Sequence, residues 1–187
     1  MDIDSSIKID VQNNVYKPAE DSYLLIKAID AGRGGKALDM GCGCGIVALH
    51  LAKKGCNVMA VDINESAVKN TKINAEKNGL VIKCVKSDLF SNVNEKFDII
   101  AFNPPYLPTK NEDVAWSGGR EGVEIIEKFL REAKNYLNKN GRIYLVTSSL
   151  GSFSKIIKKF SNEYEFKEIA KESLFFERIY VYMVRKR

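Results

Sequence analysis

The chain has 187 residues, the size of one domain, with a formal net charge of +5 and a pI of about 8.9. Hydrophobic residues make up 45% and charged residues 28%, which excludes a disordered or collagen-like chain. The mild positive charge permits a nucleic-acid partner but does not require one. No stretch approaches the roughly 18 apolar residues of a membrane span, and residues 1–10 lack a signal-peptide pattern. We therefore expect a cytoplasmic protein that does not contact a membrane.

Strand-like and helix-like segments alternate from residue 36 to 105, which predicts an α/β fold with parallel strands. The predicted strands, in chain order, are 37–40, 57–63, 80–86, 97–102, 142–147, 165–170 and 177–185. The predicted helices are 19–29, 45–55, 65–78, 121–140 and 152–160. We expect one domain over residues 1–187, with a short N-terminal extension (1–18). Its core would be a doubly wound, seven-stranded, mostly parallel sheet with an antiparallel C-terminal strand.

Asparagine and glycine mark the ends of several predicted helices. Asn64 is placed to cap the helix that follows it, and Gly55, Gly79 and Gly141 each follow a helical pattern. The polar segment 107–119 is predicted to be a loop over the ends of the strands.

A glycine-rich turn follows the first predicted strand, in the run 39–45 (DMGCGCG). Gly41 and Gly43 let backbone amides approach a ligand, since a Cβ atom would block the approach. The helix that follows supplies unpaired N–H groups. Asp39 would oppose a pyrophosphate but would favour a ligand that carries an ammonium group.

Two further carboxylates follow the next strands. Asp62 ends the second predicted strand, where a carboxylate can accept hydrogen bonds from ribose hydroxyls. Asp88 follows the third and could accept a hydrogen bond from an amino group such as adenine N6. With the glycine turn, these residues describe a pocket for S-adenosylmethionine.

The run Asn103-Pro104-Pro105-Tyr106 directly follows the fourth predicted strand. The prolines end the strand and direct the carbonyls of Asn103 and Pro104 into the cleft. Two acceptors beside an aromatic ring suit a planar NH₂ group, with Pro105 and Tyr106 also contacting the substrate. We predict that Asn103, Pro104 and Tyr106 take part in methyl transfer to an amide or exocyclic amine.

No metal site is expected. The chain has one histidine, His50, and its cysteines form no C-x-x-C pair. The four cysteines are predicted to be reduced and mostly buried: Cys42, Cys44, Cys56 and Cys84.

Residues 15–22 (VYKPAEDS), 39–45 and 103–106 together resemble the HemK-type, class I S-adenosylmethionine-dependent protein-glutamine methyltransferases. The chain is most similar to their short archaeal and eukaryotic branch, which acts on class-1 translation release factors. The resemblance implies a Rossmann-like fold and methylation of a glutamine in a Gly-Gly-Gln loop. It also implies that Glu20 and Asp21 lie against the cofactor cleft. Glu20 and Asn103 are thus added to the predicted cofactor contacts.

The resemblance also implies a partner. Bacterial relatives have a separate N-terminal helical domain, and only 38 residues precede Asp39 here. In the short branch, a small zinc-binding activator pairs with the methyltransferase, which implies contact along the strand 80–86 here. We expect such a heterodimer. The role of the segment 116–122 stays open.

Three other functions remain as alternatives. The first is N-methylation of an exocyclic amine of adenine or guanine in RNA or DNA, for which the same Asn-Pro-Pro-Tyr chemistry serves. A groove of basic and aromatic residues would support it, but the lysines are scattered. The second is a non-catalytic cofactor-binding protein. The third is a nicotinamide oxidoreductase, which Asp39 and the glycine spacing disfavour.

Overall fold

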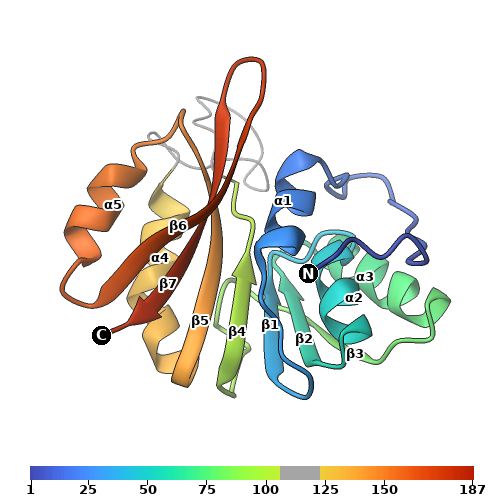
Figure 1. Ribbon diagram of the computed structural model, residues 1–187. Helices are drawn as coiled ribbons and strands as arrows, with labels where there is room; N and C mark the ends of the chain where they lie inside the picture. Colours follow the sequence, from blue (N-terminus) through green and yellow to red (C-terminus); the bar gives the residue numbers. More distant parts are fainter. Residues whose placement is uncertain (106–122) are drawn as a thin grey trace.

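A computed structural model of the protein describes residues 1–105 and 123–187. The described residues form a seven-stranded sheet with the strand order β3-β2-β1-β4-β5-β7-β6 (Figure 1). Strand β7 runs antiparallel to both β5 and β6, and all other neighbouring strands pair in parallel. The strands are β1 (Lys36–Met40), β2 (Asn57–Asp62), β3 (Ile82–Lys86), β4 (Phe97–Phe102), β5 (Leu137–Ser148), β6 (Tyr164–Ser173) and β7 (Arg178–Lys186). The doubly wound, mostly parallel fold predicted from the sequence is confirmed.

Helices cover both faces of the sheet, as a doubly wound fold requires. The helices on one face are α1 (Glu20–Ala28), α2 (Ile46–Lys53) and α3 (Glu65–Lys77), and those on the other are α4 (Glu124–Ala133) and α5 (Phe153–Phe160). A short 3₁₀ helix (Lys134–Tyr136) follows α4. Asn64 caps α3 as predicted, since its Oδ1 accepts a hydrogen bond from the Ser66 amide at 2.9 Å.

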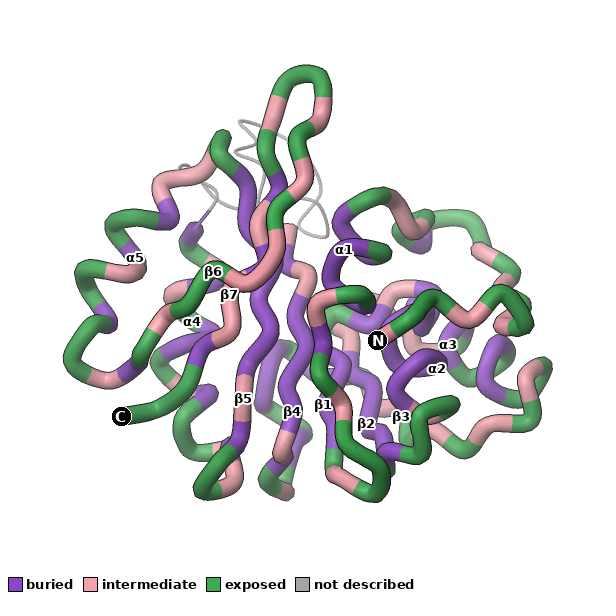
Figure 2. Tube along the Cα trace, in the orientation of Figure 1, coloured by how far each residue is buried: buried purple, intermediate pink, exposed green. Residues whose placement is uncertain are grey.

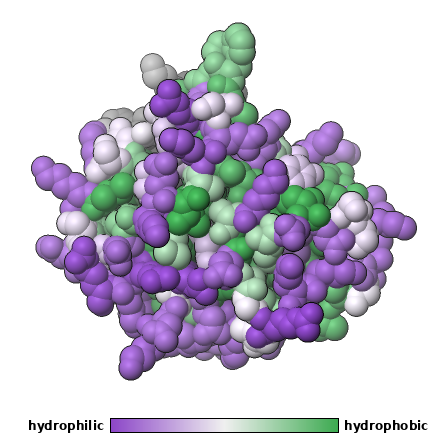
Figure 3. Space-filling model, in the orientation of Figure 1, coloured by the Kyte–Doolittle hydropathy of each residue, from purple (hydrophilic) through white to green (hydrophobic). Residues whose placement is uncertain are grey.

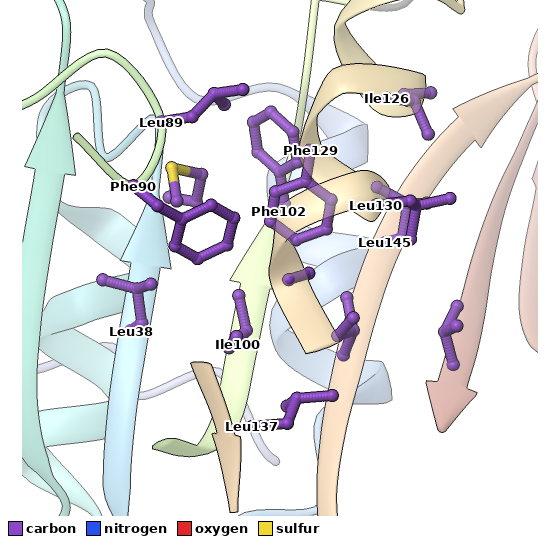
Figure 4. Packing of buried hydrophobic residues seen from close by; sticks show 14 of the residues in the cluster. Leu38, Leu89, Phe90, Ile100, Phe102, Ile126, Phe129, Leu130, Leu137 and Leu145 are labelled. Carbon is purple, nitrogen blue, oxygen red and sulfur yellow. The ribbon is translucent and has the colours of Figure 1, made fainter. Parts of the chain in front are cut away.

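The central strands are buried on both faces toward their carboxyl ends, and Figure 2 shows this as purple along most of β1 and β4 and the second half of β5. The α4 face of the sheet is packed with aromatic and branched side chains (Figure 4). Phe102 of β4 lies against Phe129 of α4, with ring centroids 4.7 Å apart. No helix connects β3 to β4; instead Leu89, Phe90 and Val93 of the connecting segment fill this side.

The end of the predicted helix 121–140 is wrong. Helix α4 ends at Ala133, and β5 already begins at Leu137. The apolar spacing matched a helix, but Leu137 is buried in a strand beside Phe97. Gly141 is not a helix cap, because it lies within β5 and packs against Phe97 of β4. A Cβ atom there would come within 2.8 Å of the Phe97 carbonyl oxygen, and the β4–β5 register shifts at this point.

Some expectations concern residues that the structure does not describe. Tyr106, the predicted loop 107–119 and the segment 116–122 lie outside the described residues, as does the start of the predicted helix at 121. Within residues 1–105 and 123–187, no helix is long and apolar enough to cross a membrane.

Candidate active site

The order in which the strands are added to the sheet reverses between β1 and β4. From β1 the chain passes outward to β2 and β3, and it then crosses back to place β4 on the other side of β1. Open α/β sheets bind ligands at the carboxyl ends of the strands where the order reverses in this way. A cavity of about 640 Å³ lies there, at the ends of β1, β2 and β4. Its size is that of a small-molecule site.

The glycine turn forms one wall of the cavity. Gly41, Gly43 and Gly45 have φ angles of 68°, 54° and 86°, in the left-handed region that favours glycine. Gly41 and Gly43 line the cavity, as predicted. Gly45 faces α3 instead, and a Cβ atom on it would lie 2.8 Å from the Thr71 side chain. The turn is therefore closed on its α3 side and open on its cavity side.

Asp39 lies at the floor of the cavity and is 3% exposed. One carboxylate oxygen accepts a hydrogen bond from the Ala48 amide in the first turn of α2, at 2.9 Å. Burial raises the pKa of Asp39 to about 7, and the nearby charge of Asp62 adds to this. A cationic ligand favours the ionised form of a buried carboxylate, and the ammonium group predicted for this position would do so here.

Asp62 lines the same cavity at the end of β2. Its Oδ2 accepts from the Gly43 amide at 3.0 Å, and its Oδ1 accepts from the Asn64 amide at 2.8 Å. The carboxylate thus ties the glycine turn to the start of α3, and burial raises its pKa. Each oxygen keeps a further acceptor position, so two ribose hydroxyls can still be accommodated.

The two acidic residues at the start of α1, Glu20 and Asp21, face different surroundings. Asp21 is 3% exposed and lines the cavity, whereas Glu20 is exposed and does not line it. Tyr16, which also lines the cavity, donates its hydroxyl to Asp21 Oδ2 at 2.9 Å. The placement therefore favours Asp21 over Glu20 as a cofactor contact.

Asp88 lies at the cavity rim, about half exposed. Its Oδ2 forms an ion pair with Lys128 Nζ of α4 at 2.8 Å. Both residues line the cavity. Asp88 is therefore positioned for the predicted contact with an amino group, and Lys128 is a neighbour that the sequence did not indicate.

Asn103, Pro104 and Pro105 line the cavity at the end of β4, which pairs with β1 beside the glycine turn. Asn103 Oδ1 is buried and has no hydrogen-bond partner among the described residues. Within the described chain, Thr147 Oγ1 of β5 is the other buried side-chain oxygen or nitrogen in this condition. An unpaired buried acceptor is costly, so Asn103 is placed to receive an N–H donor from a bound molecule. The predicted role of Tyr106 concerns a residue outside the described part.

The family model named "Methyltransferase small domain" matches residues 17–175. The chain belongs to this family. A relative from Methanocaldococcus jannaschii, with the provisional name protein N5-glutamine methyltransferase, is 42% identical over 161 residues, which cover 82% of each chain. Methyltransferase HEMK2 of Homo sapiens is 34% identical over 165 residues, covering 78% of this chain and 77% of that protein. The resemblance of the sequence motifs to HemK-type methyltransferases is thus confirmed, and this chain is a methyltransferase.

A solved structure supports the methyltransferase fold. The E. cuniculi Mtq2–Trm112 complex, described as responsible for methylation of the eRF1 translation termination factor, contains a chain that matches with a TM-score of 0.77. The match covers 92% of this chain and 99% of that one, at 24% identity. At this identity, the likeness is evidence for the fold alone.

One face of α3 in this methyltransferase carries buried polar residues that support the glycine turn, and the sequence did not indicate them. Asn70, Thr71 and Asn74 are polar, yet each is 0% exposed. Thr71 Oγ1 donates to the Gly43 carbonyl at 3.0 Å, and Asn74 Nδ2 donates to the Cys44 carbonyl at 2.9 Å. Thr71 and Asn74 therefore fix the glycine turn on the side that faces α3.

The same helix face also holds the N-terminal extension, 1–18. The Oδ1 atoms of Asn78, Asn74 and Asn70 accept the amides of Lys8, Asp10 and Gln12 at 2.8, 2.9 and 2.9 Å. Their Nδ2 atoms donate back to the carbonyls of Lys8 and Asp10. We call these three asparagines the asparagine ladder. Beyond it, the chain reaches Tyr16 at the cavity. The spacing of four residues in α3 was the available signal.

Proposed function

We propose that this protein transfers a methyl group from S-adenosylmethionine to the side-chain amide of a glutamine in a class-1 release factor. The observation that supports this most strongly is the buried, unpaired Asn103 Oδ1 in the cavity that Asp39 and Asp62 line. The eRF1 substrate of the Mtq2 complex and the name of the M. jannaschii relative agree with this acceptor.

The residues present fit the cofactor. Asp39 offers a carboxylate to the ammonium group, Asp62 offers two oxygens to ribose hydroxyls, and Asp88 stands at the rim for an amino group. Gly41 and Gly43 leave open the space that a Cβ atom would take. When bound, S-adenosylmethionine supplies a methyl group on a positively charged sulfur, which leaves as a neutral thioether.

The residues on the acceptor side of the cavity must make an amide nitrogen reactive. An amide nitrogen is a weak nucleophile, because its lone pair is delocalised. Asn103 Oδ1 accepts one N–H of the amide, and the Pro104 carbonyl accepts the other, which turns the nitrogen lone pair toward the methyl group. Both acceptors also stabilise the positive charge that develops on nitrogen. The proton becomes acidic once the methyl group is attached, and it leaves to water.

A second subunit is part of this proposal. Among the described strands, β3 pairs with β2 alone and forms one edge of the sheet, and the adjacent Val81 is 93% exposed. An exposed edge strand can be extended by a strand of another protein. The Mtq2 structure is a complex with a second protein, Trm112. We propose that a small, zinc-binding activator covers β3.

The test is methylation of the cognate class-1 release factor by the purified enzyme, with and without the co-expressed activator. We expect the release factor to gain the mass of one methyl group on the glutamine of its Gly-Gly-Gln loop, and a Gln→Glu substitution there to abolish the gain. As a control, the enzyme is given a cell lysate and S-adenosylmethionine with a labelled methyl group, and the lysate is then treated with ribonuclease. If ribonuclease removes the label, the label is on nucleic acid and the exocyclic-amine alternative is correct.

A further inference from the structure

The turn between β6 and β7 projects beyond the rest of the sheet (Figure 1). Residues 174–177 form it, closed by a hydrogen bond from the Leu174 amide to the Glu177 carbonyl at 2.8 Å. The last β5–β7 pair is Ser148 with Ile179. The turn therefore extends past the last residue of β5 that pairs with β7.

The projecting turn carries exposed aromatic rings. Phe175 is 92% exposed and Phe176 is 85% exposed. Their rings contact each other edge to face, with centroids 4.7 Å apart. We call Phe175 and Phe176 the hairpin surface; Figure 3 shows green at the tip of the projection. Adjacent exposed aromatic side chains are a mark of a binding surface.

The base of the hairpin lies at the same end of the sheet as the active-site cavity. Ser148 Oγ donates to Glu177 Oε2 at 2.5 Å, and the Arg178 amide donates to Ser149 Oγ at 2.9 Å. These bonds fix the turn at the carboxyl end of β5. The charge of Glu177 also contributes to the raised pKa of Tyr16, which lines the cavity. The hairpin surface and the cavity thus share one end of the sheet.

Whether a substrate contacts the hairpin depends on the size of that substrate. A side chain that reaches Asn103 enters over the carboxyl ends of the strands, so the body of a protein substrate must lie above this end. The projecting turn occupies part of that space. A free amino acid or short peptide could reach Asn103 without touching it.

The charges around the tip indicate the kind of partner. Lys171, Glu172, Glu177 and Arg178 flank an uncharged tip with both signs of charge. An apolar centre with a mixed polar rim is the usual anatomy of a protein interface. A membrane-binding surface would instead carry mainly lysine and arginine.

We propose that the hairpin surface binds the body of the protein whose glutamine is methylated, and so selects a folded substrate. This inference rests on the proposed function, because it assigns a second contact to the same substrate. It predicts that recognition divides in two: the cavity holds the amide, and Phe175 and Phe176 hold an apolar patch elsewhere on the release factor.

The test compares two substrates for the double variant Phe175→Ser/Phe176→Ser: the intact release factor and a short peptide with the same Gly-Gly-Gln loop. For the intact factor, we expect KM to rise at least about 10-fold, since exposed aromatic anchors dominate such interfaces. For the peptide, we expect kcat/KM to stay within about twofold of the unaltered enzyme. Cofactor affinity, measured by calorimetry, should not change.

Two matched variants complete the test. Phe175→Tyr/Phe176→Tyr keeps both rings and should retain the KM of the unaltered enzyme. Ile73→Ser removes another exposed apolar side chain, on α3, and should have no effect on either substrate. An unchanged KM for the intact factor in the serine variant would overturn the inference. So would an equal loss with the peptide, or a loss of self-association or activator binding in its place. Failure of the unaltered enzyme to methylate either substrate would instead overturn the proposed function.

Discussion

The two sides of the cavity hold their polar groups in opposite ways. On the β1–β2 side, Asp39 and Asp62 are already hydrogen-bonded to backbone amides, and α3 holds the glycine turn from behind. On the β4 side, Asn103 Oδ1 is buried without a hydrogen-bond partner in the described chain. A site for a constant small cofactor is preorganised throughout, whereas the acceptor side keeps a hydrogen-bonding position for its substrate.

Removal of Asn103 would break this comparison most strongly. In Asn103→Ala we expect kcat to fall roughly 100- to 1000-fold, the range for loss of one preorganised transition-state contact. The Kd for S-adenosylmethionine should stay within about threefold, because Asp39 and Asp62 lie on the other side. Single-turnover methyl transfer and calorimetry measure the two. A Kd that worsens as much as kcat would show that Asn103 serves mainly the cofactor.

Asp39→Asn should separate affinity from stability on the cofactor side. The raised pKa of Asp39 means that the folded state holds the proton more tightly than the unfolded chain. Its ionisation therefore destabilises the fold as the pH rises through about 7, by roughly 4 kcal/mol at most. The variant has no such charge. We expect a higher Tm than the unaltered protein at pH 8 and an equal Tm at pH 4, while cofactor affinity falls at least about 10-fold.

A variant with lower Tm at pH 8 would contradict this account of Asp39. Asp98→Asn provides a matched carboxylate on β4, bonded to the Lys36 amide and Asn138 away from the cavity. It should leave cofactor affinity unchanged.

The pH dependence of cofactor binding sharpens the same point. Only ionised Asp39 attracts an ammonium group, and its pKa is raised to about 7. Between pH 7.5 and pH 6 the ionised fraction falls, so the Kd for S-adenosylmethionine should rise roughly eightfold. Calorimetry across this range tests it, and the dependence should vanish in Asp39→Asn. An increase that persists in the variant would assign the titration to another group.

The asparagine ladder gives the smallest expected effect. Asn74 is fully buried and bonds both Asp10 and the Cys44 carbonyl, whereas Asn78 is partly exposed and bonds only the extension and its own helix. Asn74→Ala should lower the free energy of unfolding by roughly 2–3 kcal/mol and raise the Kd for the cofactor about fivefold. Asn78→Ala should cost less than about 1 kcal/mol and leave the affinity unchanged. Equal effects of the two variants on Kd would show that the ladder does not support the glycine turn.

Much of this site was predictable because its signals are local. The glycines, Asp39 and Asp62 follow strands whose apolar runs are visible in the sequence, and parallel strands bring their carboxyl ends together. Asn103 stood out through the prolines beside it. Glu20 and Asp21 are adjacent, and which of them faces the cavity depends on how α1 sits on the sheet.

The remaining features depend on contacts between distant residues. Asn74 meets Asp10 across 64 positions, so its burial has no local pattern beyond the four-residue spacing. Gly141 follows a helix-like run, yet its role is set by the Phe97 carbonyl oxygen against which it packs. Phe175 and Phe176 lie between the predicted strands 165–170 and 177–185, and only the paired β6 and β7 show that they project into solvent.

The asparagine ladder works as a gauge of chain length. Four residues of helix advance about 6.0 Å, and two residues of extended chain advance about 6.6 Å. The two repeats nearly coincide, so Asn78, Asn74 and Asn70 meet every second residue of the extension. Deletion of one residue between Gln12 and Tyr16 would draw Tyr16 back by one position from Asp21. The distance from the last rung to the cofactor cavity is thus counted in whole residues.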